Sequence, residues 1–372
     1  MTRKIGAGLT MTSPSETARA WVDIDLGALV ANARALAEAC GARLLPMVKA
    51  NGYGLGAARV AEALDVLDPW GYGVATVDEA LALRAADFGR PILVASPLSP
   101  ESFEPVLAGG FRPAVGDTAM LRAWLSRSAA PFHLEIDTGM SRAGIRWDDE
   151  RTLREAADAL ATAQGWEGVF THFHSADTDA PSMGVQWERF QAALSALPRR
   201  PPLVHAANSA AALCGRAYAA DLVRPGIFLY GGQARASAPP PRPVAALRAR
   251  VLAVRAVRAG DTVGYGAEWR APHPTTIATL GIGYADGLPR ATELREGLPP
   301  RQVELRGRIV PIVGRVTMDM CMAAVDEGAV AVGDVATLFG GRISLDEQAR
   351  AAGTVSYELL TSLGSRLPRR YR

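Results

Sequence analysis

The stretch that decides the fold is Leu44–Gly56, which reads LLPMVKANGYGLG. Five apolar residues come first, then Lys49, and then a turn that contains three glycines. A continuous apolar run of this length is typical of a parallel strand that is buried on both faces. Glycines after such a strand let a bound molecule approach the backbone, and active sites of (β/α)8 barrels lie at this end of the strands.

The same pattern recurs along the first two-thirds of the chain. Eight apolar runs alternate with segments of helical periodicity such as 77–86, 148–164 and 184–197. The runs lie at 44–48, 70–76, 91–95, 111–115, 132–137, 166–173, 203–207 and 222–230. Eight strand–helix units in this length predict a (β/α)8 barrel. A doubly wound open sheet is the alternative, but no glycine-rich dinucleotide fingerprint follows the first strand.

A proline-rich segment ends this pattern, because four of the eight residues 236–243 are proline. Beyond it, runs rich in Val, Ile and Thr at 248–257, 275–282, 302–313 and 329–338 are separated by turn residues. Helices are expected near 345–352 and 357–363. We therefore expect a flexible tail at residues 1–17, a barrel at 18–236 and a mainly antiparallel β domain at 244–372.

Composition excludes several classes of protein. The chain has 372 residues, a net charge of +2 and 49% hydrophobic residues, so neither disorder nor a nucleic-acid footprint is indicated. No apolar run is long enough to predict a membrane span, and no secretory signal is recognised, whether translation starts at Met1 or Met11. Three widely spaced cysteines favour neither a disulfide framework nor a zinc module, so we expect a cytoplasmic protein.

The lysine count singles out one residue. Among 40 lysines and arginines, only Lys4 and Lys49 are lysine. Arginine stays protonated, whereas a desolvated lysine can become a free amine that forms a Schiff base. Lys49 at the end of a barrel strand is therefore the candidate for covalent chemistry, although a lysine in a salt bridge at the barrel rim is the simpler alternative.

Further candidates follow the later strands. Arg142 lies in a glycine-containing loop and could bind a carboxylate. His172 and His174 could face the same way, but no metal ligand set is completed, and we expect no metal. Ser209 and Gly226–Ile227 follow strands seven and eight, where barrels of this kind bind phosphate. A phosphate anchor opposite a Schiff-base lysine indicates pyridoxal 5'-phosphate.

Taken together, these motifs resemble the alanine racemase family, over about residues 21–371. The matching segments, in the family's order, are Val48–Gly56, Asp137–Gly144, Asn208–Ser209, Arg224–Gly226, Gly264–Gly266, Gly283–Gly287 and Met318–Asp319. The resemblance implies a pyridoxal-phosphate enzyme that interconverts L- and D-alanine, with a barrel followed by a β domain. Its role would be either catabolic or the supply of D-alanine for peptidoglycan precursors.

The resemblance also implies roles for individual residues. Lys49 would hold the cofactor and act as one base, and Tyr265 would be the second base on the opposite face of the substrate. In the family this tyrosine comes from the second subunit, so we expect a homodimer with composite active sites. Arg142 and the Met318 N–H would bind the substrate carboxylate. Arg224 would face the pyridine nitrogen of the cofactor, and His172 would support Arg224. Tyr284 and Asp319 would lie around the entrance. The phosphate of the cofactor would be bound by Tyr53, Ser209, Gly226 and Ile227.

Two positions depart from the family pattern. Glu135 stands where many members carry a lysine that is modified to a carbamate, and we expect its carboxylate to orient Arg142 directly. Near the C-terminus, Ser365 aligns with a tyrosine that contacts the phosphate and shapes the entrance. If that alignment holds, the corridor is wider and strict preference for alanine is in doubt.

Three other functions stay open at this point. A broad-spectrum amino-acid racemase would share every catalytic residue. A decarboxylase acting on basic amino acids would share the architecture, but Tyr265 and the short chain argue against it. A non-catalytic pyridoxal-phosphate carrier would be a barrel alone, and the second domain argues against it.

Overall fold

The computed structural model describes residues 17–178, 181–290 and 298–372, and these fall into two compact units. The larger comprises residues 26–244 and 356–361, and the smaller comprises the described parts of 1–25, 245–355 and 362–372. All but one residue of the expected N-terminal tail lies outside the described residues. No helix among the described residues is long and apolar enough to cross a membrane.

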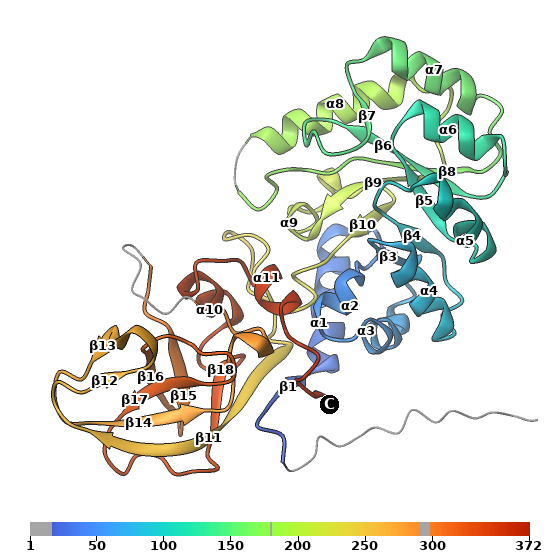
Figure 1. The fold of residues 1–372 in the computed structure, drawn as a ribbon. Helices are drawn as coiled ribbons and strands as arrows, with labels where there is room; N and C mark the ends of the chain where they lie inside the picture. The colour runs from blue at the N-terminus through green and yellow to red at the C-terminus, as the bar shows by residue number, and fades with distance from the viewer. Residues whose placement is uncertain (1–16, 179–180, 291–297) are drawn as a thin grey trace, which may run out of the picture. The chain divides into compact units, whose positions relative to one another are not determined.

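The larger unit is a parallel barrel (Figure 1). Its strands are β2 (Arg43–Leu44), β3 (Tyr72–Val74), β4 (Ile92–Val94), β5 (Arg112–Val115), β6 (Phe132–Asp137), β8 (Trp166–Phe170), β9 (Leu203–Asn208) and β10 (Leu222–Arg224). From β3 to β10, each strand pairs in parallel with the next one in this list, and β10 pairs in parallel with β2. A parallel bridge between Met47 and Gly73 joins β3 to the chain that continues β2, and so closes the ring.

Helices cover the outside of these strands. They are α1 (Leu26–Cys40), α3 (Ala57–Leu64), α4 (Val77–Ala85), α5 (Phe103–Ala108), α6 (Thr118–Leu125), α7 (Glu150–Leu160), α8 (Ser182–Ala196) and α9 (Ser209–Ala212). Helix α11 (Ser356–Thr361) is grouped with the same unit. Several begin at a polar cap. The Asp117 carboxylate, for example, accepts from the Met120 N–H at 2.7 Å at the start of α6, which satisfies a backbone donor that has no partner within the helix.

The last predicted strand is shorter than the apolar run at 222–230. It ends at Arg224 because Pro225 has no N–H to continue the ladder. The residues after it form a turn in which the Leu229 N–H donates to the Gly226 carbonyl at 2.8 Å. This turn, and not a strand, carries Gly226 and Ile227 at the carboxyl end of the barrel.

The smaller unit is a second closed sheet, mainly antiparallel. Six strands form its ring: β11 (Ala245–Val257), β14 (Thr275–Leu280), β17 (Cys321–Val325), β16 (Arg308–Val313), β15 (Gln302–Leu305) and β18 (Val335–Phe339). Strand β1 (Ala20–Ile24) pairs with β11, and β19 (Arg369–Tyr371) pairs with β1. The unit also holds the hairpin β12 (Thr262–Val263) and β13 (Trp269–Arg270), and helix α10 (Leu345–Ala351).

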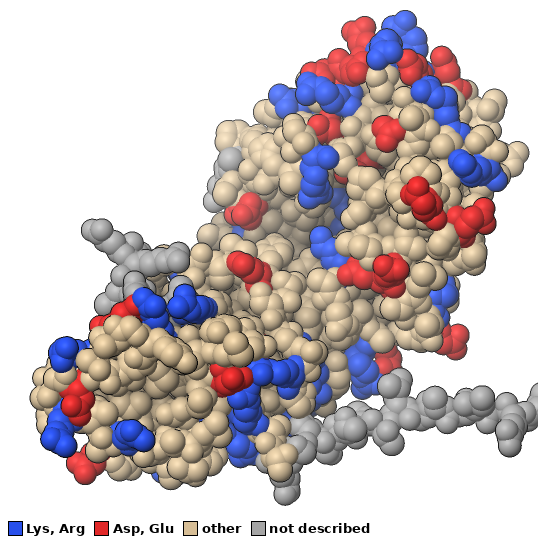
Figure 2. All heavy atoms as spheres, viewed as in Figure 1, with Lys and Arg blue, Asp and Glu red and all other residues tan. Residues whose placement is uncertain are grey.

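These two units confirm the predicted fold class of a (β/α)8 barrel followed by a mainly antiparallel β domain. Strand β1 lies within the residues expected for the barrel, yet its hydrogen bonds belong to the antiparallel sheet. Helix α11, expected in the β domain, is grouped with the barrel unit. On the face shown in Figure 2, acidic and basic side chains are interspersed over the larger unit, in keeping with the small net charge.

Candidate active site

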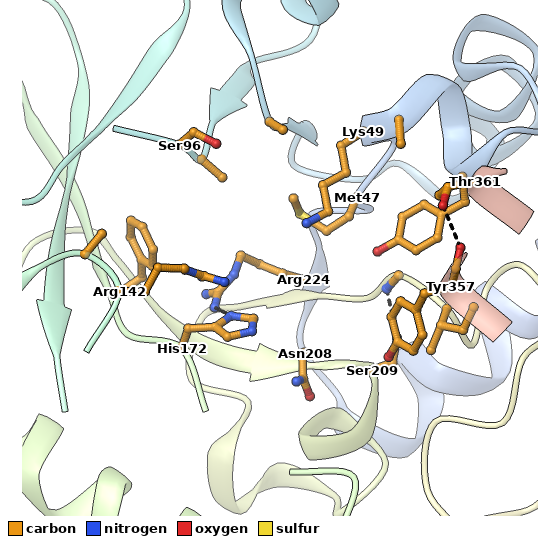
Figure 3. Close-up of a pocket in the computed structure, with 18 of the residues that line it drawn as sticks. Met47, Lys49, Ser96, Arg142, His172, Asn208, Ser209, Arg224, Tyr357 and Thr361 are labelled. Atoms are coloured by element: carbon orange, nitrogen blue, oxygen red, sulfur yellow. Dashed lines mark hydrogen bonds between the residues drawn. The ribbon is translucent and has the colours of Figure 1, made fainter. Parts of the chain in front are cut away.

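A cavity of about 510 Å³ lies at the carboxyl ends of the barrel strands. This volume is within the range typical of small-molecule sites. Its wall includes most of the barrel residues singled out from the sequence: Lys49, Tyr53, Glu135, Arg142, His172, Ser209, Arg224, Gly226 and Ile227. Figure 3 shows Lys49 and Arg142 pointing into the cavity from different sides, with His172 beside Arg224. All of these residues belong to the larger unit.

Lys49 enters this cavity from the chain that continues β2, five residues after Leu44. Burial lowers the pKa of its amine, the positive charge of Arg142 lowers it further, and the negative charge of Glu79 opposes this shift. A lowered pKa raises the fraction of free amine near neutral pH, and only the free amine can attack a carbonyl carbon.

The backbone after Lys49 has an uncommon conformation. Ala50, Asn51, Gly52 and Tyr53 have φ values of 52°, 52°, 63° and 53°, so four consecutive residues are left-handed (α2 in Figure 1). For a residue with a side chain, this conformation costs roughly 1–2 kcal/mol. The turn directs the Tyr53 ring against Tyr230, with ring centroids 4.4 Å apart.

The Tyr53 hydroxyl reaches the turn that contains Gly226. A Cβ atom at Gly226 would lie 2.2 Å from that hydroxyl oxygen, so any larger residue would have to displace the Tyr53 side chain or the turn. Burial raises the pKa of Tyr53, which keeps its hydroxyl protonated and able to donate.

Two further donors lie beside Gly226. The Ser209 hydroxyl accepts from the Gly226 N–H at 2.8 Å, and its own proton is left for another acceptor. The Ile227 residue is fully buried, and within the described part of the chain its N–H donates to no acceptor. Buried donors without protein partners at one end of a cavity fit a phosphate group.

Arg224 lies at the cavity floor and is 5% exposed. Its guanidinium donates to the Thr171 carbonyl at 2.8 Å and to the Ala206 carbonyl at 3.1 Å. The His172 Nδ1 lies 3.3 Å from the same nitrogen. Burial lowers the pKa of Arg224 to about 10, which leaves it protonated at neutral pH. Burial and the charges of Arg224, Arg142 and Lys49 lower the pKa of His172 to about 3, so His172 is neutral.

Two buried histidines continue from Arg224 into the barrel core, and sequence reasoning missed both. The His205 Nδ1 lies 2.7 Å from Arg224, and the His205 Nε2 lies 2.8 Å from the His133 Nδ1. The other nitrogen of His133 is 3.2 Å from the Glu167 carboxylate. Both histidines lie in runs that read only as apolar strands, so their polar partners could not be seen in the sequence.

Arg142 and Glu135 share the far wall of the cavity. Glu135 is 5% exposed; burial raises the pKa of its carboxyl, and the charges of Arg142 and Arg224 oppose this shift. Within the described residues, no hydrogen bond or ion pair joins Glu135 to Arg142, so their coupling there is through charge. The Arg142 loop is shaped by Asp137, whose carboxylate accepts from the Gly139 and Ser141 N–H groups.

Ser365, where a departure near the entrance was expected, is not among the residues that line the cavity. Ser365 is exposed and belongs to the smaller unit, whereas Tyr357 and Thr361 of α11 line the cavity. Tyr357 packs near Tyr53, with ring centroids 6.2 Å apart, and the Thr361 hydroxyl donates to its carbonyl. A tyrosine of this chain therefore stands at this end of the cavity, and the wider corridor expected from Ser365 stays a prediction.

The other expected residues lie in the smaller unit. Tyr265, Met318 and Tyr284 are 70%, 53% and 41% exposed, which is unusual for large apolar side chains. The Tyr284 N–H donates to the Thr317 carbonyl, which holds the Tyr284 turn beside Met318. Asp319 follows Met318 in the sequence, and its carboxylate forms ion pairs with Arg366 at 2.9 Å and with Arg19 at 3.3 Å.

Comparison with known proteins gives the same family along both units. Residues 24–234 match the family model described as alanine racemase, N-terminal domain, and residues 244–371 match alanine racemase, C-terminal domain. The chain is 40% identical to an alanine racemase of Acidiphilium cryptum, over 93% of this chain and 97% of that protein. It is also 40% identical to an alanine racemase of Deinococcus radiodurans, over 95% of this chain and 99% of that protein.

Solved structures agree. The alanine racemase of Bartonella henselae, described with covalently bound pyridoxal phosphate, has a TM-score of 0.88 at 31% identity and covers 95% of this chain and 100% of its own. The alanine racemase of Streptomyces coelicolor has a TM-score of 0.86 at 33% identity, and the match covers 96% of this chain and 98% of that chain.

Proposed function

Because this chain belongs to the alanine racemase family, we propose that it interconverts L- and D-alanine with pyridoxal 5'-phosphate as its cofactor. The observation that carries this proposal is the pairing, within one cavity, of the lysine amine with a cluster of phosphate donors. We further propose that the enzyme works in the cytoplasm and supplies D-alanine for peptidoglycan precursors.

The residues of the cavity fit this cofactor. Lys49 would hold it covalently, and Tyr53, Ser209 and the backbone of Gly226 and Ile227 would bind its phosphate. The fit rests on the buried Ile227 N–H and on the close contact at Gly226. When bound, the cofactor withdraws electrons from the substrate Cα and so makes the Cα–H bond acidic.

Arg224 would donate to the pyridine nitrogen and leave it unprotonated. Arginine has no acceptor and does not release its proton near neutral pH, so it cannot protonate the ring. This limits electron withdrawal into the ring and disfavours transamination as a side reaction.

Racemisation requires a proton to leave one face of Cα and another to arrive on the opposite face. We assign these transfers to the Lys49 amine and the Tyr265 hydroxyl: one accepts the Cα proton while the other donates to the opposite face. The roles exchange for the reverse reaction. The lowered pKa of Lys49 supports its part as a base.

Tyr265 would reach the cavity from a second copy of the chain in a homodimer. It is 70% exposed and is not among the residues that line the barrel cavity of its own chain. The partner subunit's Met318 would donate its N–H to the substrate carboxylate beside Arg142, and the partner's Tyr284 and Asp319 would border the entrance. Glu135 would hold Arg142 in place through its charge.

The test is chiral chromatography of the purified, cofactor-loaded protein after incubation with L-alanine, L-serine, L-lysine or L-arginine in separate reactions. We expect D-alanine to accumulate to an equal mixture and the other substrates to change little. Lys49→Ala, purified and treated identically, should be inactive. Racemisation of several substrates would establish the broad-spectrum enzyme instead, and carbon dioxide release from lysine or arginine would establish a decarboxylase.

A further inference from the structure

Glu79, a residue outside the cavity wall, contacts the left-handed turn that follows Lys49. One of its carboxylate oxygens accepts from the Ala50 N–H at 2.6 Å. The other accepts from the Ala75 N–H at 2.7 Å and from the Thr76 N–H at 3.3 Å. A single side chain thus joins the residue next to Lys49 to the segment between β3 and α4.

The position of Glu79 is also that of a helix-capping residue, so capping has to be weighed first. In the capping box at the start of α4, the Thr76 hydroxyl accepts from the Glu79 N–H and the Glu79 carboxylate accepts from the Thr76 N–H. The capping bond from Thr76 is the longest of the three that Glu79 accepts, at 3.3 Å. The two short bonds go to Ala50 and Ala75, so the carboxylate is placed for the turn more than for the helix.

The turn needs such a support. Three residues with side chains, Ala50, Asn51 and Tyr53, adopt the left-handed conformation that they disfavour. Within the turn, the Gly52 N–H donates to the Val48 carbonyl and the Gly54 N–H donates to the Ala50 carbonyl. Within the described residues, the Ala50 N–H has no acceptor other than Glu79, so this carboxylate secures the first peptide of the turn.

That first peptide sets the direction of the lysine. The peptide plane between Lys49 and Ala50 includes the Ala50 N–H, so holding this group fixes the backbone from which the Lys49 side chain extends. We propose that Glu79 is a positioning residue for Lys49: by binding the Ala50 N–H, it holds the left-handed turn and aims the amine at the carbonyl carbon of the cofactor. This inference rests on the cofactor assigned under the proposed function.

Charge gives the inference a second consequence. The Glu79 carboxylate opposes the lowering of the Lys49 pKa by burial and by Arg142 and Arg224. The other titratable groups of the cavity wall are Tyr53, Glu135, His172 and Tyr357. Removing the charge of Glu79 alone therefore lowers the pKa of Lys49 further, while loss of the helix cap alone does not.

The experiment compares apoprotein of the wild type, Glu79→Gln and the control Thr76→Val. The control removes the hydroxyl half of the capping box and leaves the bond from Ala50 to Glu79 in place. Affinity for pyridoxal 5'-phosphate is measured by absorbance. Reduction of the complex with borohydride, followed by mass spectrometry, then gives the pH dependence of Lys49 labelling, with Lys4 as internal reference.

We expect Glu79→Gln to weaken cofactor binding by ~10- to 100-fold, because the amide is uncharged and its single oxygen cannot accept from Ala50 and Ala75 as the two carboxylate oxygens do. We expect the midpoint of Lys49 labelling to move to lower pH, with Thr76→Val unchanged in both measurements. Equal affinity and equal midpoints for Glu79→Gln and Thr76→Val would overturn the proposal.

A second variant covers the case in which Glu79→Gln does not fold. Glu79→Asp keeps the charge but withdraws the carboxylate from Ala50, so it should lose affinity with a smaller shift of the labelling midpoint. Wild-type affinity in Glu79→Asp would contradict the inference. Neither readout uses alanine turnover, so failure of the racemase assignment is recognised separately, by a wild type that labels at Lys49 but racemises nothing.

Discussion

Arg224 and His205 lie 2.7 Å apart in the barrel core, and this contact fixes the proton positions of a whole chain of residues. Because arginine can only donate, the His205 Nδ1 must accept, and the proton of neutral His205 sits on Nε2. That proton is donated to the His133 Nδ1 at 2.8 Å, which leaves the proton of His133 on Nε2, facing Glu167. The orientation of Arg224 therefore depends on the Glu167 carboxylate, which ends this series of hydrogen bonds.

The same series of hydrogen-bonded side chains predicts how the free energy of unfolding depends on pH. Burial lowers the pKa of His133, His205 and His172 below the usual value of about 6.5, and all three are neutral in the fold. The unfolded chain binds these protons below pH ~6.5, so their contribution to stability is present above that pH and is lost as the pH falls. We expect each histidine to steepen the decline by up to about 1.4 kcal/mol per pH unit.

Urea unfolding of the apoprotein between pH 7.5 and pH 5 measures this slope. His205→Asn should flatten it by the share of one histidine, although the variant is less stable throughout. His273→Asn, which removes an exposed histidine of the smaller unit, is the matched control. A wild type whose unfolding free energy is constant across this range would contradict neutral burial of the three side chains.

Gly226 and Tyr53 should behave as one unit in mutagenesis. A Cβ at Gly226 would lie 2.2 Å from the Tyr53 hydroxyl oxygen and 2.9 Å from the ring carbon that bears it. We expect Gly226→Ala to destabilise the apoprotein by about 1–3 kcal/mol through overpacking. In the Tyr53→Phe background the worst contact is gone, so the cost of the same substitution should fall by at least ~0.5 kcal/mol in a double-mutant cycle.

Strictly additive costs in that cycle would show that the clash is relieved elsewhere.

Ser209→Ala tests the neighbouring donor without adding volume. It removes the acceptor of the Gly226 N–H and one phosphate donor, so cofactor affinity should fall by ~10-fold while packing is preserved.

Glu135 should set the acid limb of the activity profile. Burial raises the pKa of its carboxyl, so Glu135 loses its charge at a higher pH than an exposed glutamate as the solution is acidified. We expect Glu135→Gln to raise the KM for alanine at pH 8, because Arg142 loses the negative charge near it. The acid limb of kcat/KM that belongs to Glu135 should disappear in the same variant. Unchanged turnover and an unchanged pH profile would show that Glu135 only fills space.

What could be predicted from the sequence depended on whether a signal is local. The apolar runs and the glycines around Lys49 are local, and they indicated the barrel and the end of the barrel that holds the site. The supports of the site are not local. Glu79 reads as the third residue of an ordinary helix, and His133 and His205 read as parts of apolar strands, because their partners come from distant segments. Tyr357 was missed because it lies on a short helix near the chain end whose sequence carries no motif that indicates a site.

The source of the second base can be decided by mixing two inactive variants. Lys49→Ala retains Tyr265, and Tyr265→Phe retains Lys49, so each homodimer lacks one base at both sites. If Tyr265 comes from the partner subunit, a mixed dimer has one complete site and one site that lacks both bases. Random reassociation of equal amounts makes about half of the dimers mixed, with one of two sites active in each. Activity should therefore return to about one quarter of the wild-type value after denaturation and joint refolding with cofactor. If each chain used its own Tyr265, no combination would restore a complete site and the refolded mixture would stay inactive. Wild-type protein carried through the same refolding supplies the reference for recovered activity.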